Sequence, residues 1–103
     1  MIKIIATLLT LFAFNVSHAK VNVGIILGFT GPIETLTPGM SAGAELAFNE
    51  AADSGKLLNG QGINIIKVDS ACVDSAAATS AAESVISQGV TAIMGADCSG
   101  VTG

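Results

Sequence analysis

Residues 63–94, INIIKVDSACVDSAAATSAAESVISQGVTAIM, contain one complete strand–helix–strand unit. The β-branched run 63–68 predicts a buried strand, and residues 90–94 predict another. An alanine-rich helix joins them, with Asp74 or Ser75 as its N-cap. A unit of this length places its two strands parallel in one sheet through a right-handed crossover. The stretch therefore predicts an α/β fold with a parallel sheet.

The segment before this unit repeats the pattern. Residues 21–27 (VNVGIIL) predict a first buried strand. A helix is then predicted from Thr37, its N-cap, and Pro38, its first residue, to about residues 53–55. The predicted order is βαβαβ, in a three-layer lobe. The helix faces expected to pack on the sheet contain Met40, Ala44, Ala47, Phe48 and Ala51 in the first helix and Ala78, Ala82, Val85 and Ile86 in the second, which Gly89 ends.

Three loops follow the predicted strands, at residues 28–37, 69–74 and 95–99. Because the strands are parallel, their carboxyl ends and these loops lie at the same edge of the sheet. Open α/β sheets bind ligands at this edge. We therefore expect a binding site there.

Cys72 and Cys98 are the two cysteines of the chain, and each lies in one of these loops. In an exported protein, an even number of cysteines first indicates a disulfide, and a metal pair or two free thiols are the alternatives. A metal is disfavoured because the one histidine, His18, falls in a segment that we expect to be removed. If the second and third strands are neighbours, about 4.8 Å apart, the two cysteines come within bonding reach.

The first nineteen residues have the features of a secretory signal peptide. A lysine precedes the apolar stretch 4–14, and Ser17 and Ala19 supply the small side chains that signal peptidase selects. Eleven helical residues rise about 16 Å, whereas a membrane span needs about 20 residues, so a membrane anchor is the weaker alternative. We expect cleavage between Ala19 and Lys20, and no stable membrane insertion of the mature segment 20–103.

The chain is acidic and contains no arginine. Its four lysines stand against eight carboxylates, for a net charge of −4. Nucleic-acid binding needs a basic surface that neutralises phosphates, so this composition argues against a nucleic-acid partner. The expected mature segment also has no histidine, and oxidised cysteines cannot act as nucleophiles. We therefore expect no enzymatic activity, no cofactor and no metal.

Two alternatives would place other chemistry at the loop edge. Asp69, Asp74 and Asp97 could form paired carboxylates, but aspartate in such loops more often caps a helix or closes a turn. Gly28 and Gly31 follow the first strand as in a nucleotide loop, but their spacing is not G-x-G-x-x-G. Gly31 also lies 38 residues before Asp69, where about 20 are expected. We therefore reject a dinucleotide site.

Ser99 begins the last segment, SGVTG (residues 99–103), which predicts the start of a helix. A hydroxyl and free backbone N–H groups at a helix start suit a bound carboxylate. A simple N-cap role for Ser99 is the alternative, and the two roles are compatible.

Four segments resemble the leucine/isoleucine/valine-binding family of periplasmic proteins that serve ABC transporters: VGIILGFTGPIE (23–34), GMSAGAELAFNEA (39–51), DSACVDSAAATSAAESVI (69–86) and GVTAIMGADCSGVTG (89–103). The resemblance implies two α/β lobes that close on an amino acid, of which this chain would hold only the opening part of the first. It implies a disulfide between Cys72 and Cys98, and a ligand contact from Ser99 with its neighbours Gly100 and Thr102. Leu36 stands where some members place an aromatic side chain against the ligand, so the resemblance leaves the side-chain specificity open.

The function that the resemblance implies is capture of a branched-chain or related amino acid in the periplasm, for delivery to an ABC permease. An amide- or urea-binding member of the same fold is one alternative. A ligand-sensing module for a receptor is another. We also expect residues 20–103 by themselves to fold poorly, because a mature segment of 84 residues buries little surface and its sheet has open edges.

Overall fold

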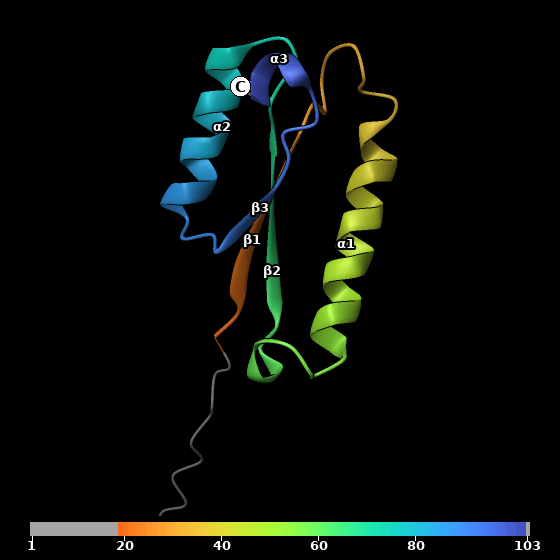
Figure 1. Cartoon of the computed structure of the whole chain (residues 1–103), viewed down its shortest axis with the longest axis vertical. Helices are drawn as coiled ribbons and strands as arrows, with labels where there is room; N and C mark the ends of the chain where they lie inside the picture. Colours follow the sequence, from red (N-terminus) through yellow and green to blue (C-terminus); the bar gives the residue numbers. More distant parts are fainter. Residues whose placement is uncertain (1–18, 103) are drawn as a thin grey trace, which may run out of the picture.

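The computed structural model describes residues 19–102, so all but the last residue of the expected signal peptide lies outside the described part. In chain order the elements are β1 (Val21–Leu27), α1 (Thr37–Asp53), the 3-10 turn η1 (Leu58–Gly60), β2 (Ile63–Asp69), α2 (Ser75–Ser87), β3 (Ala92–Met94) and α3 (Ser99–Thr102). The predicted βαβαβ order is confirmed (Figure 1).

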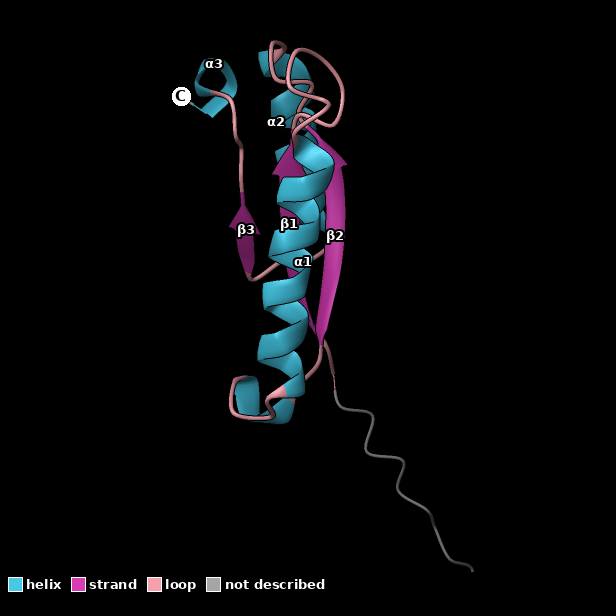
Figure 2. Ribbon diagram, turned by 90° about the vertical axis from the view of Figure 1, so that its right-hand side faces the viewer, coloured by secondary structure: helices cyan, strands magenta, loops and turns pink. Residues whose placement is uncertain are grey.

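The three strands form one parallel sheet with the order β2-β1-β3. β1 pairs with β2 along its whole length, from Val21 opposite Ile63 to Leu27 opposite Asp69. Its pairing with β3 covers only Val23 to Ile25. Figure 2 shows α1 in front of the sheet and α2 behind it, so the predicted three layers are present. None of the helices in residues 19–102 has the length and apolar character of a membrane span.

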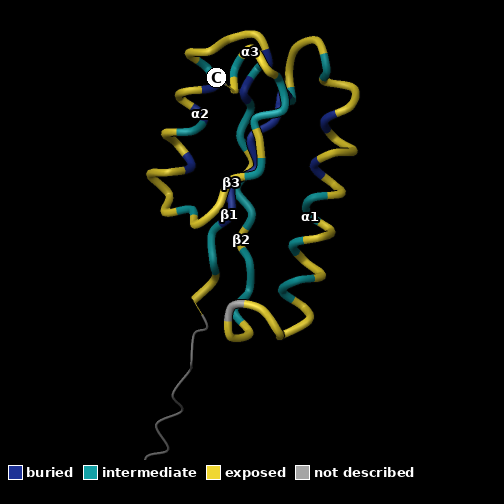
Figure 3. Tube along the Cα trace, viewed as in Figure 1, coloured by how far each residue is buried: buried dark blue, intermediate teal, exposed yellow. Residues whose placement is uncertain are grey.

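β1 is central because its residues are apolar on both faces. Ile26 packs with Ala81 and Val85 of α2 in the main core cluster, which Ile66 and Val68 of β2 extend. Side chains alternate along a strand, so Ile25, which is fully buried, faces α1. Burial is concentrated in β1 and on the inner sides of the helices (Figure 3).

Helix α1 begins one residue earlier than predicted. Leu36 is its N-cap and already has helical dihedral angles, and no side chain caps it. Thr37 is fully buried inside the first turn, and its hydroxyl donates to the carbonyl oxygen of Glu34 at 3.3 Å. The predicted N-cap role of Thr37 was wrong because the preceding turn, with Leu36 N–H bonded to Ile33 O at 2.9 Å, leads directly into the helix.

The face of α1 that packs on the sheet is also rotated from the prediction. Met40 and Ala47 are exposed, whereas Ser41 is buried and Ala44 and Phe48 are half-buried. The apolar periodicity missed this face because polar side chains lie on it. Their hydrogen bonds allow them to be buried.

Helix α2 follows its prediction more closely. The Asp74 carboxylate accepts hydrogen bonds from the N–H groups of Ala76 (2.9 Å) and Ala77 (3.1 Å), which confirms it as the N-cap. Gly89, with φ of 72°, follows the end of the helix as predicted. Ala78 and Val85 are buried, but Ile86 is 62% exposed and Ala81 lies in the core instead. The prediction placed Ile86 on the face that packs against the sheet. Ala81, three residues after Ala78, lies on that face instead.

Strand β3 is shorter than the predicted residues 90–94. It covers Ala92–Met94, and the N–H of Thr91 donates to Asn22 O at 2.8 Å before the ladder begins. Val90 packs against the core cluster of Ile26 and Val85. Its apolar character therefore reflects packing and not strand pairing.

Candidate functional site

The loops that follow the three strands meet at one edge of the sheet, as the parallel topology requires. They cover residues 28–36, 70–74 and 95–98, and α3 continues the third of them. Figure 1 shows these loops and α3 together at the carboxyl ends of the strands. This is the edge at which open α/β sheets bind ligands.

A disulfide joins two of these loops. Cys72 and Cys98 are bonded, with Cα atoms 5.3 Å apart, so the predicted pairing is confirmed. The expected reason was wrong, because β2 and β3 are not neighbours and β1 lies between them. The bond forms because both loops curl over the carboxyl end of β1, where Gly28 leaves space. A Cβ atom on Gly28 would lie 3.0 Å from the Cβ of Cys72.

Gly31 brings the first loop against the second. Its φ of 100° is in the region that side chains rarely adopt, and an added Cβ would lie 3.1 Å from the carbonyl oxygen of Ala71. Ala71 and Cys72 themselves have positive φ, of 55° and 59°. The two loops are therefore shaped against each other, and a larger residue at position 31 would separate them.

We expect Gly31→Ala to lower the free energy of unfolding of the mature protein by about 1–3 kcal/mol, because the backbone conformation there is strained for any side chain. Gly43→Ala is the matched control. Gly43 lies inside α1 with no described atom within 4 Å of an added Cβ, so alanine should stabilise by about 0.5–1 kcal/mol. Urea unfolding of both variants measures the difference. Equal effects of the two substitutions would contradict the loop geometry.

Two aspartates tie the loop after β1 to its neighbours. The Asp97 carboxylate accepts the N–H of Gly28 through both oxygens, at 3.0 and 3.2 Å. The Asp69 carboxylate accepts the Thr30 hydroxyl at 2.6 Å, the Thr30 N–H at 3.2 Å and the Ala71 N–H at 2.9 Å. The sequence indicated turn roles for Asp69, Asp74 and Asp97. It did not indicate Thr30 and Gly28 as partners of Asp69 and Asp97, because these bonds join residues distant in the chain.

The same contacts show that all three aspartates have a structural role. Asp74 caps α2, and Asp69 and Asp97 each accept backbone N–H groups. These hydrogen bonds are the turn and cap contacts that aspartate commonly makes in such loops. In residues 19–102 no three histidine, cysteine, aspartate or glutamate side chains gather as metal ligands would.

The pKa of Asp69 reflects this loop. Partial burial by itself raises the pKa, but hydrogen bonds from the Thr30 hydroxyl and from backbone N–H groups outweigh it, so the pKa lies below its usual 3.8. The charged carboxylate therefore contributes its full stabilisation at pH values above the pKa of Asp69 in the unfolded chain. This stabilisation is lost as pH falls through the folded-state pKa.

We accordingly expect the stability difference between the wild type and Asp69→Asn to be largest at neutral pH and to shrink below about pH 4. Urea unfolding of both proteins at pH 7, 4 and 3 measures it. A difference that stays constant across this range would contradict the role of the charged carboxylate.

The predicted ligand residues fall into two groups. Ser99, Gly100 and Thr102 lie in α3, and the Ser75 hydroxyl of α2 donates to Gly100 O at 3.5 Å. Ser99 is exposed, and within residues 19–102 its hydroxyl has no hydrogen bond partner. The Thr102 hydroxyl donates to Cys98 O at 2.7 Å, so it supports the turn. Leu36 is 62% exposed and is the N-cap of α1, the helix that lies on the opposite face of the sheet from α2.

Comparison with known proteins agrees with this geometry. A family model described as periplasmic binding protein matches residues 20–103. The chain belongs to the periplasmic binding protein family. Members of this family bind solutes for transport, are typically periplasmic and are generally not enzymes. No curated protein matches the chain significantly.

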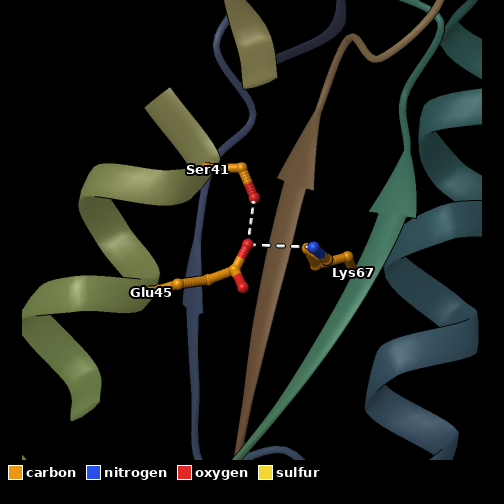
Figure 4. Close-up of polar contacts among 3 residues, drawn as sticks. All are labelled: Ser41, Glu45 and Lys67. Atoms are coloured by element: carbon orange, nitrogen blue, oxygen red, sulfur yellow. Dashed lines mark hydrogen bonds and ion pairs between the residues drawn. The ribbon is translucent and has the colours of Figure 1, made fainter. Parts of the chain in front are cut away.

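This periplasmic binding protein has a hollow of about 500 Å³ between α1 and β2. Its lining includes Phe29, Leu46, Asn49 and the three polar residues drawn in Figure 4. Glu45 Oε1 accepts the Ser41 hydroxyl at 2.8 Å and the Lys67 ammonium at 2.9 Å. The hydrogen bond from Lys67 and, to a smaller extent, that from Ser41 hold the pKa of Glu45 below its usual value.

The hollow lies on the α1 face of the sheet and meets the loop edge only at Phe29, in the loop after β1. Ser99 and its neighbours in α3 do not line the hollow. The charges of Glu45 and Lys67 neutralise each other across it. It therefore contributes no unpaired charge for a solute, and the candidate site remains the loop edge.

Proposed function

We propose that this protein is the solute-binding component of an ABC importer and captures a branched-chain or related amino acid. The observation that carries the proposal is the exposed hydroxyl of Ser99 at the carboxyl edge of the sheet. It follows directly on Cys98, which the disulfide holds in place. The carboxylate of an amino acid is a suitable acceptor for this hydroxyl and for nearby backbone N–H groups, because such charge-assisted hydrogen bonds are the stronger ones.

The neighbouring residues have distinct proposed roles. Gly100 has no side chain, so a ligand can approach the backbone of α3 closely. Thr102 supports the turn through its bond to Cys98 O and offers its hydroxyl oxygen as an acceptor. Leu36, exposed on the loop after β1, is proposed to face the apolar side chain of the ligand.

In this proposal residues 1–19 are the signal peptide and residues 20–103 form the opening part of the first of two lobes. The second lobe would supply the remaining ligand contacts and close over the solute. The partner would be an ABC permease in the inner membrane, to which the closed protein delivers its ligand.

Signal cleavage has a direct test. We expect the exported protein to begin at Lys20, because Ser17 and Ala19 are the small residues that signal peptidase selects. Intact-mass analysis of periplasmic protein measures the N-terminus. A mass that includes Met1 would contradict export by cleavage.

Calorimetric titration of the mature full-length protein, with both proposed lobes, tests the ligand class. L-leucine, L-isoleucine and L-valine should bind, and acetamide and urea should not. Binding of acetamide or urea alone would favour the amide- or urea-binding alternative, which needs no carboxylate contact at Ser99. Absence of binding to all five would contradict the proposal.

Transport and sensing are separated in cells. Deletion of the gene should abolish uptake of the amino acid that binds, measured with labelled ligand. Normal uptake with a lost transcriptional response to the same amino acid would favour a sensing module instead.

A further inference from the structure

The three loops at the candidate site are linked in a closed ring. Asp69, at the end of β2, holds Thr30 in the loop after β1. The disulfide joins the loop after β2 to the loop after β3. Asp97, in the loop after β3, closes the ring on Gly28. Each loop is therefore tied to both of the others.

Asp97 connects the chain after β3 to the end of β1, beyond the last backbone pair of the two strands. The last register pair is Ile25 with Met94, so the chain after Met94 has no ladder partner on β1. The Asp97 side chain reaches back to the N–H of Gly28, just past the end of β1, through a contact that is partly buried. A carboxylate thus continues the connection that main-chain bonds no longer make.

The two ties at consecutive residues hold the backbone that leads into α3, and the Ser75 hydroxyl adds a bond to Gly100 O within it. Cys98 is bonded to the loop after β2, and a single tie of this kind leaves the following residues free to pivot. Asp97 adds a tie to a different strand, β1. Two anchors in different directions fix the path of the chain immediately before Ser99.

We propose that Asp97 is a positioning residue for the solute site: its bond to the Gly28 N–H holds the segment Ser99–Thr102 at the carboxyl edge of the sheet. The inference rests on the proposed function, because Ser99 is the ligand residue that Asp97 positions. Asp97 itself touches no ligand in this account. Its effect on binding comes through the backbone.

The test uses Asp97→Ala and Asp97→Asn in the mature full-length protein, because asparagine keeps an oxygen that accepts the Gly28 N–H. Backbone ¹⁵N relaxation without ligand should give order parameters of about 0.85 for residues 99–102 in the wild type and in Asp97→Asn. In Asp97→Ala the same residues should have order parameters below about 0.6. Titration with L-leucine should show binding about tenfold weaker in Asp97→Ala and near wild-type strength in Asp97→Asn.

Ser41→Ala is the control for general destabilisation, because it removes a hydrogen bond on the other face of the sheet. It should lower the melting temperature without changing the order parameters of residues 99–102. Unchanged order parameters in Asp97→Ala would overturn the positioning role. A wild-type protein that binds no L-leucine would instead count against the proposed function, while the relaxation data would still decide the role of Asp97.

Discussion

Replacing Cys72 with alanine is expected to lower the free energy of unfolding of the mature protein by about 2–5 kcal/mol. The bond closes a loop across a sequence separation of 26, and in the chain-entropy description such a closure stabilises by about 3 kcal/mol. Cys72 is also buried against Gly28, so its removal leaves a space at the end of β1. Urea unfolding under oxidising conditions measures the loss.

Controls separate the bond from the side chain. Cys98→Ala should lose a similar amount, and the double variant should lose little more than either single variant, because all three lack the same bond. The relative affinities for different amino acids should stay nearly unchanged, since neither cysteine is proposed to contact the ligand. Complete alkylation of both thiols in native protein without a reductant would contradict the prediction.

Replacing Ser99 with alanine is expected to weaken binding of the amino acid by about one to two decades. A charge-assisted hydrogen bond in a closed cleft contributes about 1.5–3 kcal/mol, and each 1.4 kcal/mol changes the dissociation constant about tenfold. The melting temperature should hardly change, because the Ser99 hydroxyl makes no hydrogen bond within the described residues. Calorimetric titration and thermal melting of the same samples measure both quantities.

The alternative role of Ser99 predicts the opposite result. A helix cap would cost about 1 kcal/mol of folding stability and leave the affinity nearly intact. Ser80→Ala is the matched control, because Ser80 is an exposed serine on α2. It should leave the affinity unchanged and raise the free energy of unfolding by about 0.5 kcal/mol at most, through helix propensity. A lowered melting temperature with unchanged affinity in Ser99→Ala would place the ligand elsewhere.

Local sequence signals located most elements because short-range chemistry decides them. The apolar run of β1 predicted its bounds, and Asp74 and Gly89 marked the limits of α2 through a cap bond and a positive φ. The face of α1 could not be found this way. Ser41 and Glu45 pack toward the sheet because Lys67 of β2, distant in sequence, bonds to Glu45.

By itself, the sequence determined the parallel α/β class, the edge at which the loops gather and the presence of both cysteines there. These follow from periodicity, capping and the direction of the strands, which neighbouring residues fix. The tertiary structure alone decided that β1 lies between β2 and β3, that the disulfide crosses its end, and that Asp97 bonds to Gly28. These contacts join residues far apart in the chain. Their partners are therefore chosen by packing around β1 and not by any local preference.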